Sequence, residues 1–104
     1  MNHKLNGKVV IVTGAESGIG RSIVERCVED GACVTAAGID GEGLKKTAKI
    51  CQDLGGHERL ICTETDVREP TAINNMIAQT LEKFGRLDAA VANAGIVLGQ
   101  ARFV

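Results

Sequence analysis

The chain has 104 residues, which is enough for one domain with a modest core and excludes a large multidomain protein. Its 12 lysines and arginines are interspersed with 13 aspartates and glutamates, and the net charge is −1, so no basic face indicates binding to nucleic acid or to membrane lipid. No apolar run reaches the length of a membrane span, and the first residues lack the apolar core of a signal peptide. We therefore expect a cytoplasmic protein.

Four cysteines are spread along the chain without Cys-x-x-Cys spacing. They fall within expected helices and strands, where a thiol packs as a small apolar side chain. We expect reduced, buried thiols, and neither a disulfide framework nor a metal site. The cysteines are Cys27, Cys33, Cys51 and Cys62.

Residues 9–12, Val-Val-Ile-Val, predict a first strand over residues 8–13 that is covered on both faces, as in a parallel sheet. Gly14, Gly18 and Gly20 follow this strand. Gly14 allows a sharp turn, Gly18 lets a pyrophosphate approach backbone N–H groups, and Gly20 lets the next helix pack close to the sheet. The helix start offers free N–H donors and the positive end of a dipole, so this turn predicts a phosphate cradle.

The first helix is expected to run from residue 17 or 18 to residue 30 and to end at Gly31. Charged residues such as Arg21 are expected to face water. Apolar residues at helical spacing form the expected buried face, which consists of Ile19, Ile23, Val24, Cys27 and Val28.

Strand and helix patterns continue to alternate, with strands expected over 33–37, 59–64 and 87–92 and helices over 42–54 and 70–84. Pro70 begins the last helix and Gly85 ends it. Such strand-helix-strand units are almost always right-handed and build a parallel sheet. The expected apolar face of the last helix consists of Ile73, Ile77, Leu81 and Phe84, with Met76 and Thr80 alongside.

Asp40 stands in the turn after the second strand, where dinucleotide-binding folds place the residue that reads the adenosine ribose. A carboxylate there accepts hydrogen bonds from both ribose hydroxyls. Asp40 is equally well placed to be a turn or N-cap residue of the next helix, so both interpretations stay open.

Two further motifs follow strands. Asp66-Val67 comes after the third strand, where Asp66 could alternatively cap the helix that starts near Pro70. Asn93-Ala94-Gly95 comes directly after the fourth strand.

Together these stretches resemble the short-chain dehydrogenase/reductase family. The glycine turn has the spacing Thr-Gly-x-x-x-Gly-Ile-Gly rather than the Gly-x-Gly-x-x-Gly of other dinucleotide folds, and the Asp-Val and Asn-Ala-Gly motifs follow in the family's order. Two departures stand out. Ala92 replaces the first asparagine of the family's Asn-Asn-Ala-Gly, and Asp40 comes two positions after the family's acidic residue, which would fall at Gly38.

The resemblance implies an α/β fold, a Rossmann-type doubly wound parallel sheet of strand order 3-2-1-4, with residues 1–104 as a partial NAD(P)-binding domain truncated after the fourth strand. It places Asp66 beside the adenine amino group and Val67 on the ring, and Asn93 can tie adjacent strands through its amide. The candidate cofactor-binding residues are Gly14, Ser17, Gly18, Ile19, Gly20, Ile39, Asp40, Asp66, Val67, Asn93, Ala94 and Gly95.

The function that the resemblance implies is hydride transfer between a nicotinamide and an alcohol or carbonyl substrate. The family uses a serine, a tyrosine and a lysine, and this chain contains no tyrosine, so we assign no catalytic residue and expect the chain alone to be inactive. A small alcohol or carbonyl substrate is then expected only in a longer form. The alternatives are a non-catalytic nucleotide-binding or interaction module and a remnant that folds poorly.

NAD is expected rather than NADP as the cofactor. No basic residue stands at Ile39 or in the glycine turn, and Glu16 adds negative charge near any 2′-phosphate. A chain that ends after the fourth strand leaves residues 89–92 at an unpaired sheet edge, so we also expect marginal stability, or self-association through that edge.

Overall fold

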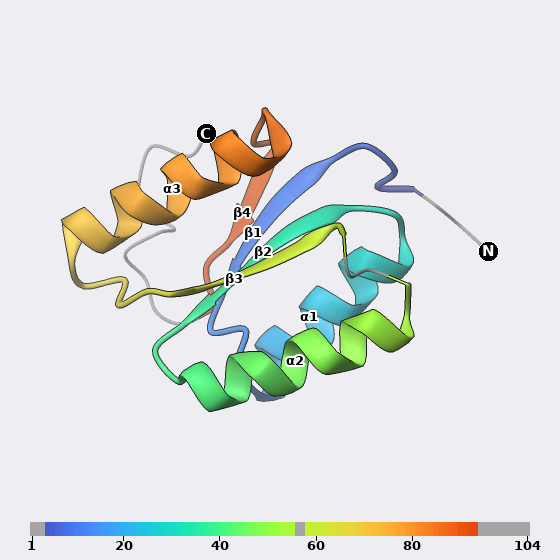
Figure 1. Ribbon diagram of the computed structural model, residues 1–104, viewed down its shortest axis with the longest axis horizontal. Helices are drawn as coiled ribbons and strands as arrows, with labels where there is room; N and C mark the ends of the chain where they lie inside the picture. Colours follow the sequence, from blue (N-terminus) through green and yellow to red (C-terminus); the bar gives the residue numbers. More distant parts are fainter. Residues whose placement is uncertain (1–3, 56–57, 94–104) are drawn as a thin grey trace.

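The computed structural model describes residues 4–55 and 58–93, in which strands and helices alternate as the sequence predicts (Figure 1). Each element lies within two residues of its predicted bounds. In chain order the elements are β1 (Val9–Thr13), α1 (Gly18–Glu29), β2 (Cys33–Gly38), α2 (Gly41–Asp53), β3 (Leu60–Glu64), α3 (Pro70–Phe84) and β4 (Ala89–Val91).

The strands form a parallel sheet of order β3-β2-β1-β4, which confirms the Rossmann-type topology. In the centre of the sheet Val12 of β1 lies opposite Ala36 of β2 on one side and Val91 of β4 on the other. Because all strands are parallel, their carboxyl ends meet at one edge, which lies to the left in Figure 1. Ligands of open α/β sheets bind at this edge.

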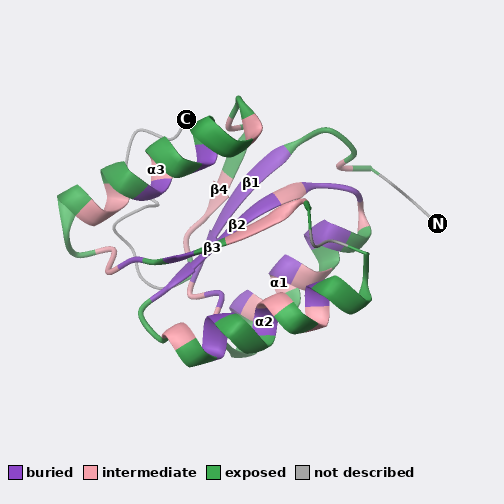
Figure 2. Cartoon of the chain, viewed as in Figure 1, coloured by how far each residue is buried: buried purple, intermediate pink, exposed green. Residues whose placement is uncertain are grey.

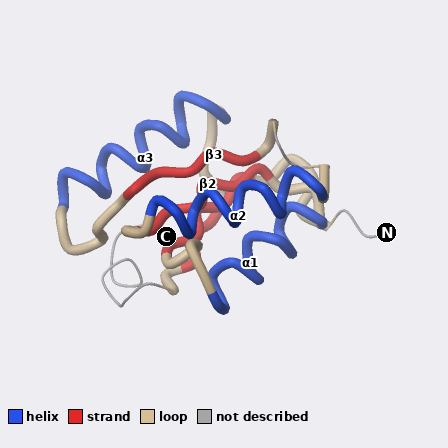
Figure 3. The backbone as a smooth tube through the Cα atoms, turned by 60° about the horizontal axis from the view of Figure 1, so that its bottom comes forward, coloured by secondary structure: helices blue, strands red, loops and turns tan. Residues whose placement is uncertain are grey.

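The β-branched run of β1 is buried because helices cover both faces of the sheet. Val10 and Val12 point to the face under α1 and α2, and Ile11 points to the opposite face, where it meets Met76 of α3. Figure 3 shows α1 and α2 in one layer and α3 in the other. Burial is concentrated on β1 and β2 between these layers (Figure 2). Each fully buried valine or isoleucine contributes about 1.5–3 kcal/mol.

Glycines end two helices at the predicted positions. Gly31 follows α1 with φ +93°, and Gly85 caps α3 with φ 81° while its N–H bonds to the carbonyl oxygen of Leu81. A residue with a side chain strains this left-handed conformation. Glycine is therefore favoured at both positions, which is why it marks the two helix ends in the sequence.

The predicted buried face of α1 is wrong at Ile19, whose side chain is 71% exposed. The residue of the first turn that faces the sheet is Gly20, because a Cβ there would lie 1.9 Å from the carbonyl oxygen of Gly14. One position along a helix rotates the side chain by about 100°, so Ile19 points away. Gly20, Val24, Cys27 and Val28 are the residues that α1 buries.

The predicted apolar face of α3 is wrong at Leu81, which is 46% exposed. The helix rests on the sheet through Met76 and Thr80, both fully buried. The hydroxyl oxygens of Thr80 and Thr35 in β2 lie 2.7 Å apart, so a polar pair inside the core fixes the rotation of α3. Apolar periodicity does not detect such a pair.

All four cysteines are free thiols, but only two are buried as predicted. Cys27 and Cys51 are buried, Cys33 is intermediate, and Cys62 is exposed because it lies on the outer strand β3. Burial raises the pKa of the Cys51 thiol to about 11, with smaller contributions from Glu25 and Cys62.

Candidate cofactor-binding site

A cavity of about 490 Å³ opens at the carboxyl ends of β1, β2 and β3. Its volume lies in the range of small-molecule sites, and it occupies the edge at which open α/β sheets bind ligands. The residues that line it are Gly14, Glu16, Ser17, Gly38, Ile39, Thr65, Asp66, Val67, Arg68 and Asn93.

The cavity brings together half of the predicted site residues. Those that line it are Gly14, Ser17, Ile39, Asp66, Val67 and Asn93. Four predicted residues are described but do not line it, namely Gly18, Ile19, Gly20 and Asp40. The predicted residues Ala94 and Gly95 lie outside the described part of the chain. Lining residues that the sequence did not single out for binding are Glu16, Gly38, Thr65 and Arg68.

The glycine turn has the geometry of an anion cradle. Gly14 and Gly18 have φ of 66° and 59°, a conformation that favours glycine. A Cβ on Gly18 would meet nothing within 4 Å, so the space beside this backbone is open. Ser17 is the N-cap of α1, and its side chain makes no capping hydrogen bond within the described chain. The first N–H groups of α1 are therefore available to a phosphate.

A partly buried polar network braces this turn against α2, and the sequence did not predict it. Arg21 was expected to face water, but it is half-buried and donates to the hydroxyl of Thr47 (2.8 Å) and to the carbonyl oxygen of Gly43 (3.0 Å). Its guanidinium also donates to the backbone carbonyl of Glu16. The contacts join residues far apart in sequence, so only the fold shows them.

Asp40 acts as the N-cap of α2, where its Oδ1 accepts a hydrogen bond from the N–H of Glu42 (3.1 Å). The prediction that Asp40 caps the next helix is therefore confirmed. A role of Asp40 toward a ribose stays a prediction.

Glu16 extends from the glycine turn to the end of β2. Its Oε2 accepts a hydrogen bond from the N–H of Ile39 at 3.0 Å. Its Oε1 is buried without a hydrogen-bond partner within the described chain. The side chain thus places a carboxylate in the wall of the cavity beside Gly38.

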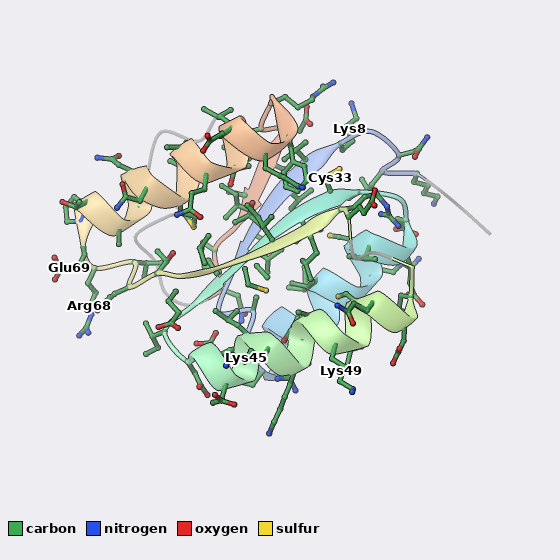
Figure 4. All side chains as sticks on the ribbon, viewed as in Figure 1. Lys8, Cys33, Lys45, Lys49, Arg68 and Glu69 are labelled. Atoms are coloured by element: carbon green, nitrogen blue, oxygen red, sulfur yellow. The ribbon has the colours of Figure 1, made fainter. Side chains whose placement is uncertain are left out.

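Asp66 and Arg68, which both line the cavity, form a bidentate pair. The guanidinium of Arg68 donates to Oδ1 at 3.0 Å and to Oδ2 at 2.9 Å, and the Arg68 N–H also donates to Oδ1 at 2.9 Å. The hydrogen bonds from the Arg68 side chain, followed by its backbone N–H, lower the pKa of Asp66 to about 2. Figure 4 labels Arg68 and Glu69 between β3 and α3. The N-cap of α3 is Glu69, so Asp66 does not cap that helix.

Asn93 ties β4 to β1 through its backbone. Its N–H donates to the hydroxyl of Thr13 at 3.0 Å, and that hydroxyl lies 3.4 Å from the carbonyl oxygen of Val91. The Asn93 side-chain nitrogen lies 3.0 Å from where a Cβ of Gly20 would be. The end of β4 therefore packs directly against the start of α1.

Within residues 4–55 and 58–93, no helix has the length and apolar character needed to cross a bilayer. The same residues contain no group of three or more histidine, cysteine, aspartate or glutamate side chains arranged to hold a metal ion.

The strand order and the cavity at the carboxyl ends of the strands are those of a Rossmann-type α/β protein. A family model described as short chain dehydrogenase matches residues 8–103. The chain belongs to the short-chain dehydrogenase family. It is 38% identical over 91 residues to 11-beta-hydroxysteroid dehydrogenase A of Sesamum indicum, a match that covers 88% of this chain and 26% of that protein.

Solved structures of the family have the same fold. The glucose dehydrogenase of Caenorhabditis elegans in the apo-form matches with a TM-score of 0.85 and 32% identity, over 92% of this chain and 41% of that chain. Carveol dehydrogenase from Mycobacterium avium in complex with NAD matches with a TM-score of 0.81 and 34% identity, over 88% of this chain and 37% of that chain. This chain thus spans less than half the length of each of these relatives.

Proposed function

We propose that this chain supplies the cofactor-binding half of an NAD(P)-dependent oxidoreductase that transfers a hydride between nicotinamide and an alcohol or carbonyl carbon. The observation that carries the proposal is that the glycine turn, the end of β2 and the Asp66-Val67 pair line one cavity. Membership of the dehydrogenase family supports the reaction class.

The residues present fit an adenine dinucleotide. The open space beside Gly18 and the free N–H groups at the start of α1 suit a pyrophosphate. Asp66 offers a carboxylate to the adenine amino group, and Val67 offers an apolar surface to the ring. When bound, the nicotinamide supplies or accepts the hydride, while the residues of this chain bind and orient the cofactor.

The cofactor that we propose is NAD. The negative charge of Glu16 in the cavity wall disfavours a 2′-phosphate. Arg68 also lines the cavity, but its guanidinium is already paired with both carboxylate oxygens of Asp66. The NAD complex of the carveol dehydrogenase supports the cofactor class.

The reaction needs groups that we do not assign to this chain. A proton donor to the substrate oxygen is required, and the sequence has no tyrosine to serve as the family's acid. We propose that the 104-residue chain binds the cofactor without catalysis and that a small alcohol or carbonyl compound is the substrate of a longer protein. The proposal includes a cytoplasmic location, where free thiols such as Cys51 stay reduced.

Self-association through β4 is a further part of the proposal. Among the described strands β4 is the outer one beside β1, and Ala89 is exposed. An outer strand presents unpaired N–H and C=O groups to a second chain. Sedimentation velocity over a concentration series should find dimers or larger species. A monomer with a cooperative thermal transition would contradict this part.

Calorimetric titration of the 104-residue chain tests the binding proposal. We expect ADP-ribose to bind with a Kd of about 0.1–1 mM, or about 4–5.5 kcal/mol, and NAD to bind within about threefold of it, since we assign no residue of this chain to the nicotinamide. NADP should bind more weakly than NAD. A chain that binds none of these ligands would overturn the proposal, and a large preference for NAD over ADP-ribose would contradict the adenosine-only site.

A matched pair of variants locates the phosphate site. Asparagine and aspartate both tolerate the left-handed conformation of Gly18, and the space around it is open, so both variants should fold. Gly18→Asp puts a negative charge beside the pyrophosphate and should weaken ADP-ribose binding about tenfold more than Gly18→Asn does. Equal losses would place the phosphate elsewhere.

A further inference from the structure

Glycine 38 occupies the end of β2, where dinucleotide-binding folds carry the acidic residue that reads the adenosine ribose. The space that its side chain would take is filled from another element. A Cβ on Gly38 would lie 2.3 Å from Oε1 and 2.7 Å from Oε2 of Glu16. The Glu16 carboxylate therefore occupies the space that the side chain of an acidic residue at position 38 would enter.

Two hydrogen bonds hold Glu16 in this place, and a glycine of α2 leaves room for it. The N–H of Ile39 donates to Oε2 at 3.0 Å, and the guanidinium of Arg21 binds the Glu16 carbonyl. A Cβ on Gly43 in α2 would lie 2.8 Å from the Cβ of Glu16 and 2.6 Å from its carbonyl oxygen. Two glycines on different elements, Gly38 and Gly43, thus make room for one glutamate.

The carboxylate has acceptor capacity that the described chain does not use. Oε1 is buried without a hydrogen-bond partner within the described residues, although the side chain lines the cavity. A buried carboxylate oxygen without a donor is costly. Rotation of the Glu16 carboxyl group about its terminal bond would bring this oxygen to the cavity, where a ligand hydroxyl can supply the donor.

We propose that Glu16 is the residue that reads the adenosine ribose, accepting hydrogen bonds from the 2′- and 3′-hydroxyls in place of an acid at position 38. This inference rests on the proposed binding of an adenine nucleotide in the cavity. Asp40 is the other acidic candidate, but it caps α2 and does not line the cavity. In this chain the acidic residue that determines the choice of cofactor therefore lies in the glycine turn, whereas other dinucleotide-binding folds carry it at the end of β2.

The first test compares ADP with 2′-deoxy-ADP, which differ only in the 2′-hydroxyl, one of the two hydroxyls that Glu16 is proposed to bind. The wild-type chain should bind the deoxynucleotide about tenfold more weakly, as expected for a hydrogen bond to a charged acceptor. Glu16→Ala should bind both nucleotides equally. Circular dichroism and thermal unfolding of each variant check that the fold is retained.

The second test changes Gly38 and leaves Glu16 in place. The atoms that a new Cβ at position 38 meets are the movable end of the Glu16 side chain, so Gly38→Ala should displace the carboxylate rather than the backbone. This variant should lose the preference for the 2′-hydroxyl although Glu16 is present. In the Glu16→Ala background, Gly38→Ala should leave the affinity ratio of ADP to 2′-deoxy-ADP unchanged.

The third test moves the carboxylate to β2. Glu16→Ala removes the side chain that fills the space beside position 38, so Gly38→Asp should fit in that background and restore the tenfold preference for ADP. Gly38→Asn in the same background is the matched control, since it has the same size without the charge. It should restore little of the preference.

The outcomes separate this inference from the proposed function. A wild-type chain that does not bind ADP overturns both. Binding of ADP without regard to the 2′-hydroxyl, or a preference that survives Glu16→Ala, overturns the role of Glu16 and leaves nucleotide binding intact. If Glu16→Ala does not fold, the isosteric Glu16→Gln decides. It should shift the affinity ratio of NADP to NAD at least about threefold toward NADP, and an unchanged ratio overturns the inference.

Discussion

The hydroxyl of Thr47 in α2 donates to the carbonyl oxygen of Ala15 in the glycine turn, 2.8 Å away, and accepts from Nε of Arg21 at the same distance. Thr47 is fully buried, and its bond to Ala15 lies out of water. One side chain therefore couples the helix after β2 to the turn that is proposed to hold the pyrophosphate.

Replacement of Thr47 by valine should destabilise both the fold and the site. The substitution keeps the shape but leaves the Ala15 carbonyl without this donor and Arg21 without this acceptor, at a cost of about 1–3 kcal/mol in the free energy of unfolding. Thr47→Ser keeps the hydroxyl and loses one methyl group, so it should cost about 1 kcal/mol. Urea unfolding measures both. A serine variant less stable than the valine variant would contradict the role of the hydroxyl.

Replacement by alanine should cost more stability at Gly20 than at Gly18. A Cβ on Gly20 would lie 1.9 Å from the carbonyl oxygen of Gly14, a backbone atom that cannot move aside, so Gly20→Ala should cost at least about 3 kcal/mol or prevent folding. A Cβ on Gly18 meets nothing within 4 Å, and only its φ of +59° is unfavourable, so Gly18→Ala should cost about 1–2 kcal/mol. Thermal unfolding ranks the two, and equal losses would contradict the close packing at Gly20.

The elements of the fold were predictable because their signals are local. The β-branched run of β1, Pro70 at the start of α3 and Gly85 at its end each act within a few residues. The glycine turn and Asp66-Val67 were recognised for the same reason, and both line the cavity.

The roles of Arg21 and Glu16 depend on contacts that the fold creates. Arg21 reads as a solvent-facing helix residue, yet its partner Thr47 is 26 residues away. Glu16 was singled out for its charge alone, because nothing in the sequence places its carboxylate beside Gly38. Helical spacing likewise misplaced Ile19, whose exposure follows from the tight approach of Gly20 to Gly14.

The ion pair of Asp66 and Arg68 predicts a specific dependence on pH. The pKa of Asp66 is lowered to about 2, so its ionised form is favoured in the folded chain. The stabilisation is complete above the unfolded pKa near 4 and is lost as the pH falls from about 4 to about 2. Arg68→Ala should return the Asp66 pKa toward 3.8, its ordinary value, as followed by NMR titration of the carboxyl carbon.

Arg86→Ala is the matched control for that titration. Arg86 pairs with Asp88 at 2.7 Å and lowers the pKa of that carboxyl, so its removal should raise the pKa of Asp88 and leave Asp66 unchanged. A pKa of Asp66 that stays near 2 in Arg68→Ala would show that the Arg68 guanidinium is not the main cause.

The buried hydroxyl pair of Thr35 and Thr80 should give unequal effects when each is replaced. Thr80 also donates to the carbonyl oxygen of Met76 at 2.8 Å, so the hydroxyl of Thr35 is the donor in the 2.7 Å contact between them. Thr80→Val leaves that buried donor without its partner and should cost about 1–3 kcal/mol. Thr35→Val removes the donor and leaves Thr80 bonded to Met76, so it should cost less.

The double variant is the decisive measurement for this pair. With both hydroxyls replaced by methyl groups, no donor of the pair remains unpaired, so Thr35→Val should recover part of the stability that Thr80→Val loses. Urea unfolding of the wild type, both single variants and the double variant gives the coupling energy. Strictly additive losses would mean that the two hydroxyls do not interact, and α3 would then be held on the sheet by its apolar contacts through Met76, Ile73 and Ile77.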